Sequence, residues 1–90
     1  MIKVGVDIDG TIETEVNEKV EPRKDVIQLV ELLQKFGCDI YLWSRRGEEH
    51  ALYIRNMFGL KAKIAPKGSF QPDIAIDNEE MGLGKLNIKV

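Results

Sequence analysis

The fold of this chain is decided by one short segment, which reads Ile2-Lys3-Val4-Gly5-Val6-Asp7-Ile8-Asp9-Gly10-Thr11. Its first part, residues 2–8, is rich in β-branched apolar residues, a pattern typical of a buried central strand. The apolar run ends abruptly in an acidic turn that contains Asp7 and Asp9 and is followed by Gly10 and Thr11. We therefore expect a buried strand that presents two carboxylates at its carboxyl end.

Helical and strand-like patterns alternate after this turn. Residues 11–21 are polar and acidic, which indicates a loop or a small hairpin flap. One helix is expected to begin at Pro22 and to end before Gly37, because apolar residues recur between them at the three-and-four spacing of a buried helical face. A second helix is expected over about 48–58. Further strands are expected at residues 38–43, 61–65, 73–77 and, as a short edge strand, 86–90.

Strands that alternate with helices predict an α/β domain with a parallel sheet of four or five strands, joined by right-handed crossovers. We expect a minimal three-layer, Rossmann-like fold that forms a single domain over residues 1–90, because a second core would not fit in ninety residues. Ligands bind such sheets at the carboxyl ends of the strands. Side chains distant in the sequence should therefore meet at one edge: Asp7, Asp9, Ser44 and Asp77.

The composition is that of a soluble globular protein, with 43% hydrophobic and 31% charged residues. The formal net charge is −2 and the basic residues are scattered, so nucleic acid is not indicated as a partner. No apolar run approaches the roughly 18 residues of a membrane span, and no membrane partner is expected. The single cysteine, Cys38, excludes an internal disulfide and favours a reducing, cytoplasmic location.

The acidic residues predict a site for a metal ion and a phosphate. Three carboxylates in one cleft, those of Asp7, Asp9 and Asp77, repel one another, and a bound dication would remove most of that penalty. Ligand sets made only of oxygen atoms favour Mg²⁺. Gly10 has no side chain where a phosphate must approach the backbone, and the neighbouring N–H groups can face anionic oxygens.

Four segments of the chain resemble, in order, the motifs of the haloacid dehalogenase superfamily. Residues 4–12 resemble the first motif, and Leu42-Trp43-Ser44 resembles the second. Lys67 is the strongest candidate for the third motif, with Lys61 and Lys63 nearby in the sequence, and residues 74–78 resemble the fourth. The resemblance covers the bare core of the family fold and implies that a cap domain is missing.

The resemblance implies a Mg²⁺-dependent phosphatase that hydrolyses a phosphomonoester of unknown identity through an aspartyl-phosphate. Asp7 would be the nucleophile, and Asp9 would protonate the leaving group and then activate water. The Asp7 carboxylate, the Asp9 carbonyl and Asp77 would hold the metal. Ser44 would hydrogen-bond a phosphoryl oxygen, and Lys67 would neutralise the nucleophile and the phosphate.

The residues expected to contact the substrate lie in two loops at the strand ends, and they are Gly10, Thr11, Ser44, Arg45 and Arg46. The two arginines are included because guanidinium groups beside the pocket can grip a phosphate or a carboxylate, although ordinary surface arginine is an alternative. Trp43 is expected in the core. His50 is expected on a solvated helix face, because neither a triad partner nor metal-ligand spacing surrounds it in the sequence.

Other assignments stay open at the level of sequence. The residue that supports the metal beside Asp77 is Asn78, Glu79 or Glu80. The alternative function, from another class, is a non-catalytic or weakly catalytic module that binds phosphoryl groups and regulates a partner. The missing cap leaves either an open cleft or a lid supplied by a second copy of the chain.

Overall fold

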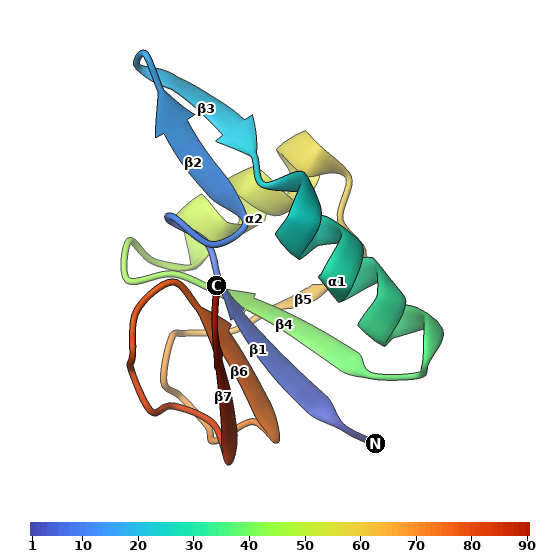
Figure 1. Cartoon of the computed structure of the whole chain (residues 1–90). Coiled ribbons are helices and arrows are strands. Elements are labelled where there is room, and N and C mark those ends of the chain that lie inside the picture. The colour runs from blue at the N-terminus through green and yellow to red at the C-terminus, as the bar shows by residue number, and fades with distance from the viewer.

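The computed structural model describes all 90 residues, which form two helices and seven strands (Figure 1). Five strands make the central sheet: β1 (Lys3–Asp7), β4 (Asp39–Trp43), β5 (Lys63–Ile64), β6 (Ile74–Asp77) and β7 (Leu86–Lys89). Their order in the sheet is β5-β4-β1-β6-β7, and every neighbouring pair is parallel. The predicted α/β domain with a parallel sheet of four or five strands is confirmed.

Strand β1 occupies the centre of the sheet and is buried on both faces. Val4 and Val6 are fully buried on one face. On the other face, a Cβ atom placed on Gly5 would lie 2.4 Å from Cζ2 of Trp43, so that only glycine leaves room for the indole ring. Trp43 is 1% exposed, which confirms its predicted place in the core.

Both helices cover the same face of the sheet (Figure 1). Helix α1 (Lys24–Lys35) buries Val26 and Val30, and helix α2 (Glu48–Phe58) buries Ala51 and Ile54. These side chains join one hydrophobic cluster with residues of three strands, namely Val4, Val6, Ile40, Leu42 and Ile76. Neither helix has the length and apolar character needed to cross a membrane.

The opposite face of the sheet is covered by the connection between β5 and β6, residues 65–73, which contains no helix. Phe70 of this connection packs on Tyr41 and Trp43, with ring centroids 4.9 and 5.4 Å from theirs. The sequence predicted three layers, whereas here two helices lie on one face and an irregular loop lies on the other. Two prolines and a glycine keep this loop from forming the helix that a third layer needs.

A hairpin projects from the carboxyl end of β1, where the sequence indicated a loop or a small flap (Figure 1). Strands β2 (Glu13–Val16) and β3 (Lys19–Pro22) pair antiparallel. The two residues of the turn, Asn17 and Glu18, have φ values of 51° and 64°, as a tight hairpin turn requires. Helix α1 begins at Lys24 and not at Pro22, because Pro22 pairs with Glu13 in the hairpin.

Candidate active site

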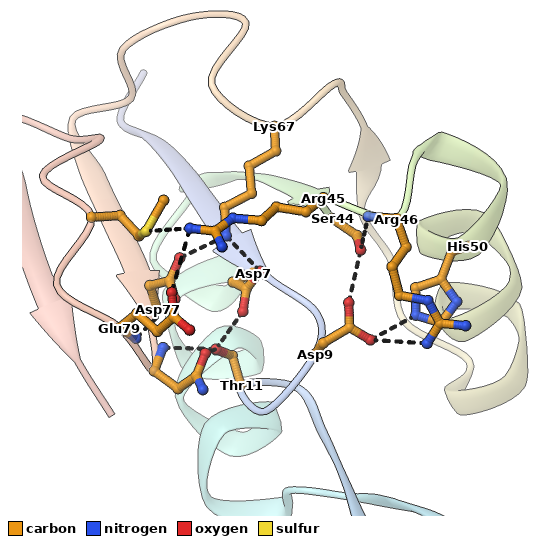
Figure 2. Close-up of polar contacts among 12 residues, drawn as sticks. Asp7, Asp9, Thr11, Ser44, Arg45, Arg46, His50, Lys67, Asp77 and Glu79 are labelled. Atoms are coloured by element: carbon orange, nitrogen blue, oxygen red, sulfur yellow. Dashed lines mark hydrogen bonds and ion pairs between the residues drawn. The ribbon is translucent and has the colours of Figure 1, made fainter.

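The carboxyl ends of β1, β4 and β6 meet at one edge of the sheet, as their parallel pairing requires. Asp7 ends β1, Asp77 ends β6, and Ser44 directly follows β4. The exposed fractions of Asp7, Ser44 and Asp77 are 4, 4 and 6%. Figure 2 shows these side chains together with Asp9 and Lys67 around the carboxyl ends of the strands.

Lys67 joins the two buried aspartates. Its Nζ donates to Oδ1 of Asp7 at 2.8 Å and to Oδ2 of Asp77 at 2.9 Å, and its side chain is 10% exposed. The two neighbouring lysines lie elsewhere, since Lys63 pairs with the first residue of β4 and Lys61 lines a hollow beside the end of α1. Among the three candidates, the structure therefore places only Lys67 in this site.

The charges in this group are unbalanced. Burial raises the pKa of Asp7, and the charge of Asp77 acts in the same direction, against the hydrogen bond from Lys67. Burial opposes the charged form of Lys67, but its two hydrogen bonds to the aspartates outweigh this and raise its pKa. Two carboxyl groups share a single ammonium here, and this arrangement favours the binding of a cation.

Thr11 fixes the orientation of Asp7. Its Oγ1 donates to Oδ2 of Asp7 at 3.0 Å and accepts from the backbone N–H of Asn78 at 2.9 Å. The residue is fully buried. The sequence predicted that Thr11 contacts the substrate, but its hydroxyl is used inside the protein, where it ties the first acidic turn to the loop after β6.

Gly10 also differs from its predicted role. Its N–H donates to the carbonyl of Glu13 at 2.8 Å, and the N–H of Thr11 donates to the carbonyl of Ile8 at 3.1 Å. These two groups therefore do not face a bound anion, because the turn itself satisfies them. Gly10 is needed for another reason: its φ is 81°, and a Cβ atom would lie 2.5 Å from the side-chain amide of Asn78.

The carboxylate of Asp9 points away from Asp7 and Asp77, towards α2 (Figure 2). Its Oδ2 accepts from Oγ of Ser44 at 2.9 Å, and its Oδ1 lies 2.9 Å from Nε2 of His50. Partial burial opposes ionisation of Asp9, but the hydrogen bonds from Ser44 and His50 outweigh it and lower the pKa of this carboxyl. The side chain stays 36% exposed, so it remains accessible from the pocket.

His50 and Glu13 belong to the site although sequence reasoning did not place them there. His50 was expected on a solvated face, but its side chain is 15% exposed and meets Asp9. Glu13 is 7% exposed, and burial, together with its hydrogen bond to Asp9 and the charge of Asp9, raises its pKa. The only feature of the sequence that could have placed His50 in the site is its position in the first turn of the helix after Ser44.

The two arginines reach different parts of the site. Nη2 of Arg45 lies 3.4 Å from Oε2 of Glu79, and its side chain is 61% exposed. Nη1 of Arg46 lies 3.4 Å from Oδ1 of Asp9, and its side chain is 68% exposed. Each guanidinium has five N–H groups, so donors remain for an anionic substrate.

The predicted metal ligands surround one point, which is filled by the side chain of Asn78. The inward-facing end of the amide lies 3.2 Å from the Asp9 carbonyl, 3.1 Å from Asp7 Oδ2 and 3.2 Å from Asp77 Oδ1. No three His, Cys, Asp or Glu side chains form a metal-binding group, because Asp9 contributes its carbonyl and not its carboxylate. The three oxygens fit the preference of Mg²⁺ for hard donors.

Two adjoining hollows give access to these groups. One, of about 140 Å³, is lined by Asp7, Asp9, Arg45, Lys67, Asp77, Asn78 and Glu79. The other, of about 640 Å³, lies beneath the hairpin and is lined by Asp9, Gly10, Glu13, Thr14, Glu15, Val20 and Arg46. Asp9 lines both hollows.

The chain was also compared with known proteins. None of the family models, characterised proteins or solved structures matches this chain.

Proposed function

We propose that this chain is a Mg²⁺-dependent phosphatase of the haloacid dehalogenase type, with a capless core that hydrolyses a phosphomonoester. The supporting observation is that Asp7, Asp77 and the Asp9 carbonyl converge on one point while Lys67 bridges the two aspartates. The five-stranded parallel sheet with its acids at the strand ends agrees with such a core. A cytoplasmic location belongs to the same proposal, because Cys38 is a free thiol.

Asp7 is the proposed nucleophile. Thr11 holds one of its oxygens and Lys67 the other, so the carboxylate is oriented before the substrate arrives. One oxygen of Asp7 forms a bond to phosphorus as the bond from phosphorus to the leaving oxygen breaks, which gives an aspartyl-phosphate. The ammonium of Lys67 reduces the repulsion between the carboxylate and the incoming phosphate.

Asp9 is the proposed general acid and base. The hydrogen bonds from Ser44 and His50 lower the pKa of Asp9, and the negative charge of the bound phosphate acts in the opposite direction and favours its protonated form. Protonated Asp9 gives its proton to the leaving oxygen in the first step, and in the second it takes a proton from the water that attacks phosphorus and frees Asp7. Ser44 and His50 hold the Asp9 carboxylate between the two hollows, where a leaving group and then a water can reach it. Ser44 also lies at the strand end where a phosphoryl oxygen is expected.

The charged groups around the phosphate complete the proposed site. The Asp7 carboxylate, the Asp9 carbonyl and Asp77 would hold Mg²⁺, which supplies positive charge that offsets the repulsion between nucleophile and phosphate. Arg45 and Arg46 would bind the phosphate or an acidic group of the substrate from the open side.

The purified protein should release phosphate from members of a panel of phosphomonoesters, beginning with p-nitrophenyl phosphate, in the presence of Mg²⁺ and not in excess EDTA. The panel should range from sugar phosphates to phosphopeptides, because the open cleft does not limit the leaving group. Absence of turnover on the whole panel would reject the phosphatase. If Mg²⁺ and beryllofluoride then bind together in calorimetry, the regulatory phosphoryl-binding module is the better description.

Asp9→Ala should lower kcat by roughly 10² to 10⁴ for an alkyl phosphate, because the alkoxide would leave without a proton. The loss should be smaller for p-nitrophenyl phosphate, whose leaving group is stable as an anion. Steady-state phosphate release from the two substrates measures the difference. Asp39→Asn is the control, since Asp39 pairs with Lys63 at the other end of the sheet. Equal rates for Asp9→Ala and the wild type would remove Asp9 from the mechanism.

A further inference from the structure

The larger of the two hollows, beneath the hairpin of β2 and β3, lies where the alcohol part of a phosphomonoester would sit. Its volume is about 640 Å³, against about 140 Å³ for the smaller hollow. The smaller hollow contains Asp7, the proposed nucleophile, and is therefore the phosphoryl end of the site. Because Asp9 lines both hollows, an ester whose leaving oxygen meets Asp9 extends into the larger one. The lining of the larger hollow thus contacts the leaving alcohol.

The hairpin turns acidic side chains, and no basic one, towards this hollow. Glu15 pairs with Val20, and residues directly opposite each other in an antiparallel pair share one face. Both residues line the hollow, and so does Glu13 on the same strand. Lys19 is the only basic residue of the hairpin, and it pairs with Val16 and does not line the hollow. The hairpin therefore gives the hollow a negative charge.

Glu15 is the carboxylate of this lining that has no charged partner in the protein. Asp9 lies 2.9 Å from Nε2 of His50 and 3.4 Å from Nη1 of Arg46, which is the one guanidinium in the lining. Glu13 is 7% exposed, and its carboxyl group meets Asp9. Glu15 is exposed, and the cationic side chains of the lining lie at Asp9 and not at Glu15. Its charge is therefore open to a ligand.

The distance from Asp9 to Glu15 suits a small alcohol. Glu13 meets Asp9, and Glu15 lies two residues further along β2. Two residues of an extended strand advance about 7 Å. A short carbon chain or a sugar ring spans such a length. A positive group at the far end of the leaving alcohol would therefore meet Glu15, while Val20, which is 44% exposed, would contact its carbon atoms.

We propose that the larger hollow selects a leaving alcohol that carries an ammonium group, and that Glu15 is the residue that determines this specificity. The inference rests on the proposed function, because it assigns the alcohol side of the same site. The open cleft leaves the size of the alcohol free, whereas the charge of Glu15 attracts a cation and repels an anion. Arg46 stays beside Asp9, at the phosphoryl end of the hollow.

Three small esters of similar size separate charge from shape. They are the monophosphates of ethanolamine, ethylene glycol and glycolate, whose free ends are an ammonium, a hydroxyl and a carboxylate. Glu15→Gln should lower the ratio of kcat/KM for the ethanolamine ester to that for the glycol ester by about three- to fivefold, as expected for one partly exposed ion pair. It should also raise kcat/KM for the glycolate ester. Comparing ratios between the two proteins cancels the intrinsic reactivity of each ester.

Two controls identify the charge of Glu15 as the cause. Glu18→Gln makes the same change of charge in the turn of the same hairpin, at a residue that does not line the hollow, and it should leave the ratio unchanged. Added salt should reduce the preference of the wild type for the ethanolamine ester, because an exposed ion pair is screened by salt.

Phosphonates provide a measurement that needs no turnover. In isothermal titrations with Mg²⁺ present, 2-aminoethylphosphonate should bind the wild type about three- to fivefold more tightly than 2-hydroxyethylphosphonate. Glu15→Gln should bind the two compounds equally. Glu15 is exposed, so this variant should fold as the wild type does.

The outcomes distinguish this inference from the proposed function. If the esters are hydrolysed with the same ratio by the wild type and by Glu15→Gln, the inference fails and the proposed function stands. A lower kcat/KM of Glu15→Gln for the glycolate ester would also overturn the inference. If no ester is hydrolysed but the phosphonates show the preference that depends on Glu15, the inference holds and the phosphatase is rejected. If the esters are not hydrolysed and neither phosphonate binds, both proposals fail.

Discussion

Replacement of Asp7 by asparagine is expected to abolish phosphate release, with kcat lower by about 10⁴-fold or more. An amide cannot attack phosphorus as a carboxylate does, so the aspartyl-phosphate cannot form. The amide oxygen can still accept the hydrogen bond that Thr11 donates to Asp7 in the wild type, and the fold should persist. Steady-state kinetics with the most active substrate of the panel measures the loss.

Two further measurements separate chemistry from folding in this variant. Mass spectrometry of acid-quenched reactions should find a phosphoryl group on the wild-type chain and none on Asp7→Asn. Asp39→Asn, which makes the same change of charge at the opposite end of β4, should keep wild-type activity. If Asp7→Asn retained more than about a hundredth of the activity while folded, another residue would be the nucleophile.

Replacement of Lys67 by methionine is expected to lower the free energy of unfolding by about 3 to 5 kcal/mol at pH 7.5 without Mg²⁺. The change leaves Asp7 and Asp77, which are 4 and 6% exposed, without the ammonium between them. Loss of that much stability is severe for a domain whose total is about 5 to 15 kcal/mol. Phosphatase activity should also fall, because the charge that offsets the phosphate is lost.

The pH dependence of this deficit identifies its electrostatic origin. The pKa of Asp7 in the folded protein is already above its ordinary value of 3.8 because of burial, and loss of the ammonium raises it further. A carboxyl with a raised pKa stabilises the fold fully below its unfolded pKa and loses that contribution as the pH rises through the folded value. The deficit should therefore shrink near pH 4 and widen towards neutrality.

Urea unfolding at several pH values, with and without Mg²⁺, measures the Lys67→Met deficit. Added Mg²⁺ should recover part of the lost stability, since a dication can replace the missing charge. Lys63→Met is the matched control, because Lys63 is 62% exposed and such a pair contributes about 1 kcal/mol or less. A deficit that is constant with pH and insensitive to Mg²⁺ would mean that Lys67 acts through packing alone.

The grouping of two aspartates at one edge of the sheet could be predicted from the sequence, because a parallel sheet leaves few alternatives for where its strands end. Once residues 2–8 and 73–77 are assigned to parallel strands, Asp7 and Asp77 must lie at the same edge of the sheet. Lys67 could be named from the sequence as the strongest of three candidates. Its position depends on how an irregular loop returns across the strand ends, and such a path has no periodic signal in the sequence.

The remaining parts of the site depend on backbone directions that side-chain patterns do not encode. His50 reaches Asp9 because Gly47, with a φ of 102°, sets the direction in which α2 leaves the strand end. Glu13 resembles the other acidic residues of the hairpin in sequence, but it is 7% exposed in the structure. The missing third layer has a different origin, since the two prolines and the glycine between β5 and β6 were already visible in the sequence, and the three-layer prediction did not take them into account.

The loop between β5 and β6 has two roles in this chain of 90 residues. Its Phe70 rests on Tyr41 and Trp43 and so seals the face that no helix protects, while Lys67, three positions earlier, bridges Asp7 and Asp77. Natural variation in those aromatic rings should consequently be constrained by chemistry as well as by packing. A substitution that loosens the packing of Phe70 would also displace the ammonium of Lys67. One change would then disturb both the packing of the sheet and the candidate active site.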